Sequence, residues 1–423
     1  MTLHDNPWLR TFLIIFTGQA FSLLGSAALN FALVWWITAE TGSASMLAYA
    51  FIAAILPHGV LGPLVGPLID RWDRRLTMIG ADLFIAATSL LILAVFYWGS
   101  LSLGMVIGVI ALRSAGAAFH TPASQAAVPM YVPAEHLMRV AGWNFFLGSG
   151  TAMAAPVLGA FLLGIGPLSA VIGLDVAGAA IAVVSLLLVR IPHPRAAGEV
   201  PGRSGLAAEF LEGWRELVRH RGLLQLTLLF AVVSLIYMPL GALFPLMTLE
   251  HFGGDALRWS LTEFAFGLGM LAGSLGLGLA AARMSGVRLV GVGILLEGAA
   301  VGASGLLPRS GFWAFAALCV IMGLAVPLLG APITAMFQRS IEPSKLGRVM
   351  ALYTTICSIV TPAGLLLAGP LAERTGVAVW FALSGLLIFL AGLVLWALPA
   401  VRQMEQTEAA AGCEAWDMQE SPE

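Results

Sequence analysis

The chain has 423 residues, of which 59% are hydrophobic and 10% are charged, and its formal net charge is −2. Soluble globular domains have an apolar fraction near one half, so this composition, with a mean hydropathy of +0.92, excludes that class. The near-neutral charge, without a basic patch, gives no indication of a nucleic-acid partner. The three cysteines have no metal-ligand spacing, so neither a disulfide framework, a metal nor a cofactor is expected.

Apolar runs of about 20 residues recur along the chain, and each is long enough to cross a bilayer as a helix. The first run, residues 9–37, is too long for a signal-peptide core and is expected to remain as the first span. Twelve spans are predicted, at residues 10–37, 46–69, 76–98, 101–123, 137–163, 168–189, 223–248, 258–282, 288–307, 312–336, 348–372 and 377–399.

The basic residues predict the orientation of these spans. Seventeen of the 21 Lys and Arg residues fall on the side of the two termini, three fall opposite, and Arg113 lies within a span. By the positive-inside rule both termini are expected to be cytoplasmic, in a multi-pass protein of the bacterial cytoplasmic (inner) membrane.

The longest polar stretch, residues 190–222, divides the chain into six and six spans. Phe210, Trp214 and Leu217 alternate there with charged residues, which is typical of an amphipathic surface helix. The predicted organisation is an N-terminal six-helix bundle (1–189), a cytoplasmic linker (190–222), a C-terminal six-helix bundle (223–399) and a disordered acidic tail (400–423).

The two halves resemble each other at an offset near 210 residues. Pro122 and Pro133 are matched by Pro332 and Pro343, and GPLIDR at 66–71 is matched by GLAAAR at 278–283. Because six is an even number, the halves have the same orientation, as in parallel repeats. The predicted fold is an all-α membrane protein with two bundles around a central cavity.

A charged stretch, GPLIDRWDRR at 66–75, separates the second and third runs and must lie outside hydrocarbon. It resembles the signature loop of the major facilitator superfamily. The stretches GQAFSLLGS (18–26), TGS (41–43) and TPASQAAVPMYVP (121–133) resemble the macrolide-efflux and siderophore-export-like branch of the drug:proton antiporters. The resemblance covers residues 8–400.

The fifth run resembles the antiporter packing motif through Gly142, Pro156 and Gly159, although Thr151 and Ala155 replace two of its glycines. Small residues there would allow close helix approach; the alternative is a generic packing helix.

The signature loop is expected to act as a conformational latch that stabilises one state of the transporter. Its members are Gly66, Asp70, Arg71, Arg74 and, two turns into the third span, Asp82. Asp70 would meet the N-terminal dipole of a helix in the other half. The alternative is a topology anchor that depends on its arginines alone.

Placing an ionisable side chain inside a span costs free energy, so such residues mark functional sites and are candidates for proton coupling. Arg113 should therefore face the cavity or an acid. The resemblance implies that an Arg in the fourth helix tunes a nearby proton site; the alternative is a structural ion pair. Asp175 and Glu297 lie deepest, and Glu263 lies a turn or so into the eighth span. His120 is more simply a satisfied polar group at a helix end.

Polar side chains at helical spacing form stripes in the first and seventh spans, which are equivalent in the two halves. They are expected to face the central cavity, although they could instead join helices by hydrogen bonds. The predicted cavity residues are Gln19, Ser22, Ser26, Asn30, His58, Trp143, Phe146, Phe230, Ser234, Tyr237 and Met238.

The resemblance implies a proton-coupled exporter of amphipathic small molecules, of the multidrug or macrolide type, that works by alternating access. The alternative is export or import of a specific metabolite, siderophore or lipid. A P-loop motif is absent, and no catalytic nucleophile stands out, so the chain is not expected to be an enzyme. Its expected partners are a small-molecule substrate, protons and the lipid bilayer, and it is expected to be a monomer.

Overall fold

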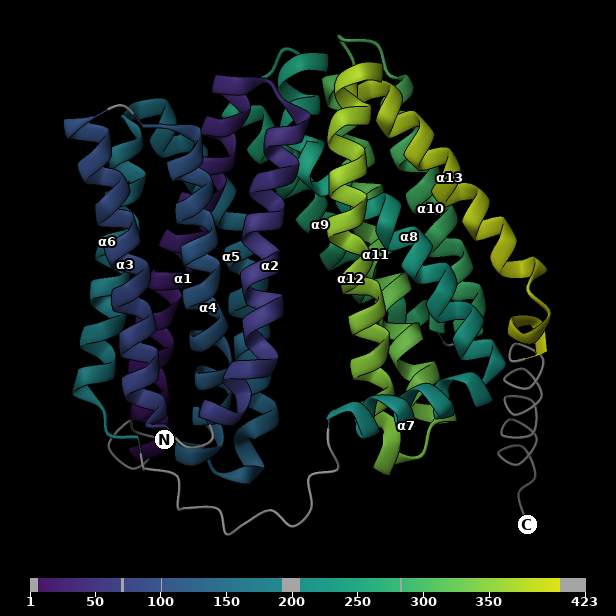
Figure 1. Ribbon diagram of the computed structural model, residues 1–423, viewed down its shortest axis with the longest axis horizontal. Helices are drawn as coiled ribbons and strands as arrows, with labels where there is room; N and C mark the ends of the chain where they lie inside the picture. The colour runs from purple at the N-terminus through teal and green to yellow at the C-terminus, as the bar shows by residue number, and fades with distance from the viewer. Residues whose placement is uncertain (1–6, 70–71, 100, 192–205, 282–283, 404–423) are drawn as a thin grey trace. The chain divides into compact units, whose positions relative to one another are not determined.

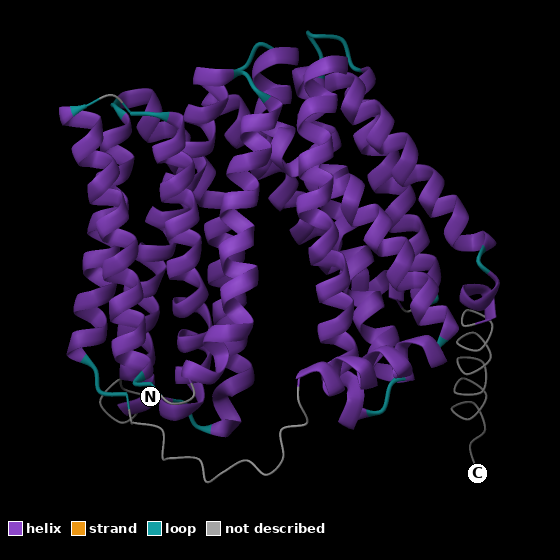
Figure 2. Ribbon diagram, in the orientation of Figure 1, coloured by secondary structure: helices purple, strands orange, loops and turns teal. Residues whose placement is uncertain are grey.

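The computed structural model describes residues 7–69, 72–99, 101–191, 206–281 and 284–403, and these are helical apart from short turns and loops (Figures 1 and 2). The helices are α1 (Pro7–Thr41), α2 (Ala44–Ile69), α3 (Arg74–Trp98), α4 (Leu103–Tyr131), η1 (Ala134–His136), α5 (Leu137–Ile165), α6 (Leu168–Leu188), α7 (Leu206–Arg219), α8 (Arg221–Leu246), η2 (Met247–His251), α9 (Ala256–Ala281), α10 (Gly286–Leu306), α11 (Phe312–Ser340), α12 (Pro343–Thr375) and α13 (Val377–Ala397).

Twelve helices of the described chain are long and apolar enough to cross a membrane, which confirms the predicted all-α membrane fold. Helices α4 and α11 continue past their predicted ends at residues 123 and 336, to Tyr131 and Ser340. Pro122 and Pro332, which match each other in the two halves, lie inside α4 and α11. A membrane helix tolerates an internal proline because neighbouring groups can satisfy the carbonyl that loses its partner.

Local chemistry explains several helix ends. The side chains of Asp73, Ser102 and Ser285 accept hydrogen bonds from backbone N–H groups in the first turns of α3, α4 and α10. Gly42 and Gly253 follow the first span of each half and have φ values of 55° and 60°. Glycine adopts this left-handed conformation without a steric penalty, so both halves turn in the same way at equivalent positions.

The chain forms two compact units, Met1–Val200 with Gly254–Phe264 (the first unit) and Pro201–Gly253 with Ala265–Glu423 (the second unit). The predicted domain boundaries stay a prediction.

Close helix contacts hold the first unit together. In it α1 packs on α6 and α5, α4 packs on α2 and α3, and α3 packs on α6. A Cβ added at Gly25 of α1 would lie 2.9 Å from the Cα of Asp175 in α6, so only glycine permits this approach. Arg75, at the start of α3, donates to the carbonyls of Leu186 and Leu187 at 2.7 and 2.9 Å and so satisfies the last turn of α6.

The second unit contains α10 between α11 and α13, and α8 beside α12 and α13. Gly298 of α10 and Gly385 of α13 approach so closely that an added Cβ at either would overlap the backbone of the other helix. Stacked and edge-on rings join α8, α11 and α13, among them Phe244, Phe315 and Phe381.

Helix α7 lies crosswise at one end of the second unit (Figure 1). Two ion pairs attach it to the start of α12: Lys345 Nζ lies 3.0 Å from Glu216 Oε2, and Arg348 Nη1 lies 2.7 Å from Glu212 Oε2. Leu217 is fully buried on its inner face, whereas Phe210 and Trp214 are exposed. The apolar side chains of α7 are therefore divided between packed and exposed positions, and the amphipathic surface helix predicted for the linker stays a prediction.

Candidate functional site

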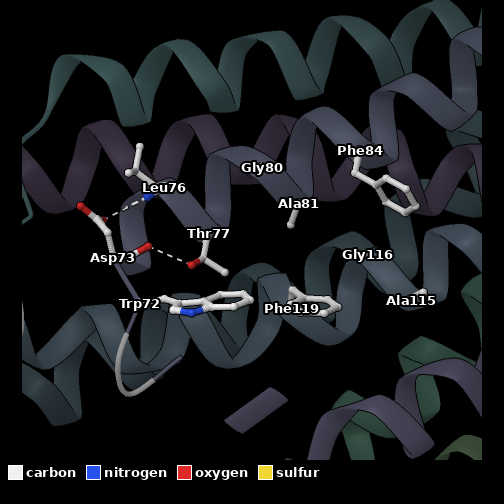
Figure 3. Close-up of a pocket in the computed structure, with 10 residues that line it drawn as sticks. All are labelled: Trp72, Asp73, Leu76, Thr77, Gly80, Ala81, Phe84, Ala115, Gly116 and Phe119. Atoms are coloured by element: carbon white, nitrogen blue, oxygen red, sulfur yellow. Dashed lines mark hydrogen bonds between the residues drawn. The ribbon is translucent and has the colours of Figure 1, made fainter. Parts of the chain in front are cut away.

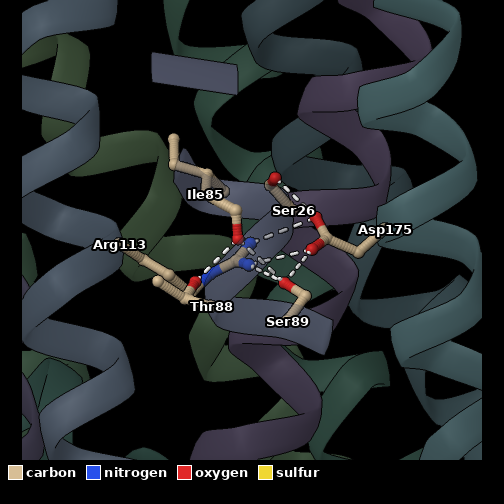
Figure 4. A network of polar contacts seen from close by, with 6 residues as sticks. All are labelled: Ser26, Ile85, Thr88, Ser89, Arg113 and Asp175. Atoms are coloured by element: carbon tan, nitrogen blue, oxygen red, sulfur yellow. Dashed lines mark hydrogen bonds and ion pairs between the residues drawn. The ribbon is translucent and has the colours of Figure 1, made fainter. Parts of the chain in front are cut away.

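A buried ion pair forms the centre of the first unit (Figure 4). The guanidinium of Arg113 in α4 donates to both carboxylate oxygens of Asp175 in α6, at 2.8 and 3.1 Å. Ser26 of α1 donates to the same carboxylate at 2.7 Å, and Ser89 of α3 accepts from Arg113 and donates to Asp175. Four helices therefore meet at one carboxylate.

Burying these two charges costs free energy unless each charged group has its hydrogen-bond partners. The residues Arg113 and Asp175 are 5% and 0% exposed. An unpaired buried charge costs several kcal/mol, and bidentate geometry with further hydrogen bonds offsets that cost. Asp175 accepts four hydrogen bonds, so its lone pairs are filled. Ser89 was missed by sequence reasoning, because a single serine in an apolar run gives no signal.

A second polar cluster lies in the same unit. Gln19 of α1 donates to Oδ2 of Asp82 at 3.3 Å, and Nε2 of His120 lies 3.5 Å from Oδ1 of the same carboxylate. Asp82 is 3% exposed. The structure thus brings a predicted cavity residue, Gln19, together with a predicted latch residue, Asp82. His120 was expected to be a satisfied polar group at a helix end; it lies instead inside α4, beside a cavity, and its Nε2 has no hydrogen bond of good geometry in the described chain.

Two cavities of the first unit border these clusters. One, of about 190 Å³, is lined by Ser26, Asn30 and His58 together with Arg113. The other, of about 320 Å³, lies between α1, α4 and α5 and is lined in part by Gln19 and His120. The stripe predicted on α1 is therefore divided between two cavities.

The backbone of α2, beside the first of these cavities, bonds to a side chain of α4. The Ser114 hydroxyl accepts the backbone N–H of His58 at 3.2 Å and donates to the carbonyl of Ala54 at 2.6 Å. These two backbone groups lie one helical turn apart in α2, so the hydroxyl of Ser114 bridges them from α4.

Glu297, in α10 of the second unit, is a buried acid. It is 2% exposed, and neither carboxylate oxygen has a hydrogen-bond partner of good geometry in the described chain. The hydroxyl of Tyr237 in α8, a predicted cavity residue, faces it. Burial without a cation penalises the charged form of a carboxyl group.

Glu263 has a different environment. It lies in α9 and accepts a hydrogen bond from Nε1 of Trp259, one turn earlier, at 3.1 Å. The structure does not place it in the network of Arg113, Asp175 and their serines. The predicted proton-coupling residues thus occupy three separate sites.

The other predicted cavity residues lie on α1, α5 and α8. On α5, Trp143 meets Phe146 edge-on at 6.2 Å, and both side chains are exposed. On α8, the ring of Phe230 lies 6.4 Å from Tyr353 of α12. Ser22 and Ser234 are buried, and Met238 is 42% exposed.

The predicted latch is described only in part. Asp70 and Arg71 lie outside the described residues, and Gly66 lies near the end of α2. Arg74 begins α3, and Asp82 lies two turns further on, against Gln19 and His120 rather than beside the loop. Arg75, which ties α3 to α6, was not among the predicted residues.

The helix-packing motif predicted on α5 is in close contact with another helix at one end and not at the other. A Cβ at Gly159 would lie 3.0 Å from the carbonyl oxygen of Ala28 in α1, whereas a Cβ at Gly142 would meet nothing within 4 Å. Pro156 lies inside the helix. Only the Gly159 end of the motif is in close helix contact.

A larger cavity, of about 720 Å³, is an apolar groove between α3 and α4 that runs from Trp72 and Asp73 to Phe84 (Figure 3). Trp72 and Phe119 stack in it at 6.4 Å. Apart from Asp73, which caps α3, its lining carries no charge. The polar chemistry of this unit lies elsewhere, and the described residues contain no cluster of metal-ligating side chains.

The chain is similar in sequence to a family of known proteins. The family model "Major Facilitator Superfamily" matches residues 15–276 and 240–412. The chain is 40% identical to macrolide efflux protein A of Streptococcus pyogenes over 402 residues, covering 95% of this chain and 98% of that protein. It is 27% identical to the multidrug efflux pump Tap of Mycobacterium bovis over 405 residues, covering 93% of this chain and 94% of that protein.

Solved structures share the fold. A bacterial homologue of the iron transporter ferroportin, in an inward-facing state, matches with a TM-score of 0.69 at 15% identity, covering 93% of this chain and 99% of that one.

Proposed function

Because the chain belongs to the major facilitator superfamily of membrane transporters, we propose that it exports amphipathic small molecules of the macrolide type in exchange for protons. The observation that carries this proposal is the 40% identity to macrolide efflux protein A along almost the whole of both chains. The likeness to a multidrug efflux pump supports the same class of substrate.

The buried ionisable groups supply chemistry that fits proton exchange. Glu297, buried without a cation, is suited to carry a proton in one state and to release it when water reaches the site. Arg113 and Asp175 tie four helices together through one carboxylate, so a change in that network alters the packing of the whole first unit. Glu263 remains a further proton-coupling candidate.

The energy available is adequate for concentrative export. One charge that crosses about 100 mV yields roughly 2.3 kcal/mol, and about 1.4 kcal/mol corresponds to a tenfold gradient. One proton therefore supports a substrate gradient of roughly 50-fold.

The chain works as a monomer in the bacterial cytoplasmic membrane with both termini in the cytoplasm, as the distribution of basic residues favours. The signature loop, with Gly66, Asp70, Arg71 and Arg74, acts as the conformational latch.

Transport by purified protein in proteoliposomes tests the function. An imposed pH gradient should drive accumulation of radiolabelled erythromycin, and a protonophore should abolish it. Accumulation that ignores the pH gradient would contradict proton coupling. Transport of an unrelated metabolite but not of erythromycin would favour a specific metabolite carrier.

Orientation is tested with a native thiol. In a variant whose only cysteine is Cys413, a membrane-impermeant maleimide should label inside-out vesicles and not right-side-out vesicles. The reverse pattern would place the C-terminus outside the cell.

A further inference from the structure

The apolar groove between α3 and α4 (the α3–α4 groove) is a cavity that the transport chemistry above does not use. Its volume is about 720 Å³, within the range of small-molecule sites. One wall runs from Trp72 to Phe84 along α3, and the other is made by Ala115, Gly116 and Phe119 of α4 (Figure 3). All of the described lining belongs to the first unit.

The carboxylate and the hydroxyl in this lining are already bonded within α3. The Asp73 carboxylate accepts the backbone N–H of Leu76 at 3.1 Å, and the Thr77 hydroxyl donates to the carbonyl of Asp73 at 2.8 Å (Figure 3). A cavity retains an ordered water only where roughly two to four polar partners are available. Beyond the first turn of α3 the groove therefore favours hydrocarbon over water.

The groove has the length of one leaflet of a bilayer. Phe84 lies ten residues beyond Arg74, the first residue of the spanning helix α3. At about 1.5 Å per residue, this separation is about 15 Å along the helix axis. The hydrocarbon core of a bilayer is about 30 Å thick, so a groove of this length extends from the headgroup boundary to about the middle of the core.

Charge is confined to the end of the groove at the connection between α2 and α3. Residues 70–75 contain two Asp and three Arg, a formal charge of +1, whereas the described lining beyond Asp73 is uncharged. Trp72 stacks on Phe119 at this end, and tryptophan is typical of the membrane–water interface. A phospholipid has the complementary pattern, with a phosphate at one end and an apolar chain as long as one leaflet.

Two glycines line the groove for different reasons. A Cβ at Gly116 would lie 2.8 Å from a side-chain carbon of Ile85, so the packing of α4 on α3 requires glycine there. Gly80 is exposed, and a Cβ added to it would meet nothing within 4 Å. Helix packing does not require glycine at position 80, and a large side chain there would fill the groove.

We propose that the α3–α4 groove binds one acyl chain of a phospholipid, from the leaflet on the side of the connection between α2 and α3. The lipid phosphate lies at the level of Trp72 and Arg74, and the chain extends along α3 to Phe84. Hydrocarbon fills a space in which water finds no partners, and the net positive charge of residues 70–75 matches the phosphate. This lipid site does not depend on which compound the protein exports.

The test uses full-length protein in phosphatidylcholine nanodiscs that contain a small fraction of a photoreactive phosphatidylcholine. One probe carries a diazirine near the methyl end of an acyl chain, and a second carries it on the headgroup. After irradiation and digestion, mass spectrometry locates the adducts. The chain probe should label residues 81–84, and the headgroup probe should label residues 72–77.

Ordinary bilayer contact provides the reference for this labelling. Leu386 and Leu390 of the spanning helix α13 are exposed. The chain probe should label residues 81–84 at least about tenfold more than these leucines, a preference of about 1.4 kcal/mol. Gly80→Phe should reduce the labelling to the α13 level, because its ring fills the groove. Gly173→Phe in α6 is the matched control: that glycine is also exposed, a Cβ there would meet nothing within 4 Å, and the labelling should stay at the wild-type level.

Other results overturn the inference. It fails if residues 81–84 are labelled no more than the α13 leucines, or if the headgroup probe labels them instead of the chain probe. It also fails if Gly80→Phe unfolds at the wild-type Tm and keeps the labelling. Loss of the labelling when erythromycin is added would show that the groove receives the transported compound and would overturn its assignment to a lipid. The positions labelled in wild-type protein decide the question even if Gly80→Phe does not fold.

Discussion

At the scale of single residues, Asp175 shows how a buried charge is held. It accepts hydrogen bonds from Ser26, Ser89 and both terminal nitrogens of Arg113. Hydropathy alone indicates that a guanidinium inside a span needs an acid or a cavity. It does not indicate which acid, because the partner lies 62 residues away on another helix.

Replacing Asp175 with Asn should destabilise the protein by about 3–5 kcal/mol, because Arg113 is left buried without its counter-ion. Thermal unfolding of purified protein in detergent should show the loss as a lower Tm. The double variant Asp175→Asn with Arg113→Gln should recover most of it, since both charges are then absent. A double variant that also exports substrate normally would make the ion pair purely structural.

Replacing Glu297 with Gln should leave the fold intact, because the carboxyl group has no cation to lose. Uphill transport driven by a pH gradient should fall by at least about tenfold if this group carries the proton. Substrate counterflow, which needs no net proton movement, should persist. Normal uphill transport in this variant would assign the proton to another acid.

At the scale of helices, hydropathy located the spans. An apolar run of about 20 residues between charged loops has the length and composition of a membrane-spanning helix. Hydropathy could not give the ends of α4 and α11, because proline is an ambiguous signal in a membrane helix. Nor could it reveal that the Ser114 hydroxyl bonds to the backbone of α2, because that contact depends on how α4 packs against α2.

The contact of α10 with α13 depends on glycine. Gly385→Ala places a Cβ against the backbone of Gly302 and should cost about 1–3 kcal/mol by forcing the helices apart. Gly276→Ala in α9 is the control, since its Cβ would meet nothing within 4 Å. Unfolding followed by thiol labelling of buried Cys319 should separate the two variants, and equal midpoints would refute the close contact.

The attachment of α7 to α12 should depend on pH. The hydrogen bond from Lys345 holds the pKa of Glu216 below its ordinary value of 4.5. A lowered pKa means that the pair stabilises the attachment above pH 4.5 and that this contribution is lost as pH falls through the lower folded value.

Amide hydrogen exchange across α7 measures this dependence. At neutral pH, Glu216→Gln should exchange faster than wild type, and the difference should vanish once the wild-type carboxylate is protonated. Arg215→Gln, an exposed position on the same helix, is the matched control. A difference that persists unchanged into acid would exclude the Glu216–Lys345 pair as its cause.

At the scale of the whole molecule, the repeat predicted two similar halves from proline and glycine positions alone. The chemistry of the halves differs, because the first unit pairs its buried arginine with an acid, whereas Glu297 has no such partner among the described residues. Sequence similarity between the halves could not show this, since it depends on which side chains meet in space.

The fold should not need the acidic segment that follows Gln403. Val401 is fully buried, and Arg402 bonds to the carbonyl of Trp396, so the described packing continues to this point. Truncation after Gln403 should leave the Tm within about 2 °C of wild type, whereas truncation after Trp396 should lower it, because buried Val401 is lost. Equal loss in both variants would show that the segment beyond 403 contributes to stability.

The ion pair of Arg113 and Asp175 also constrains how the protein is made. A ribosome adds roughly 5–20 residues per second, so the 62 residues between them take roughly 3–12 s to synthesise. During that interval α4 carries a guanidinium whose counter-ion does not yet exist. Its entry into lipid therefore has to wait, at the insertion machinery or beside earlier helices, until α6 emerges. Membrane insertion of the first unit is therefore complete only after its sixth span, α6, has been synthesised.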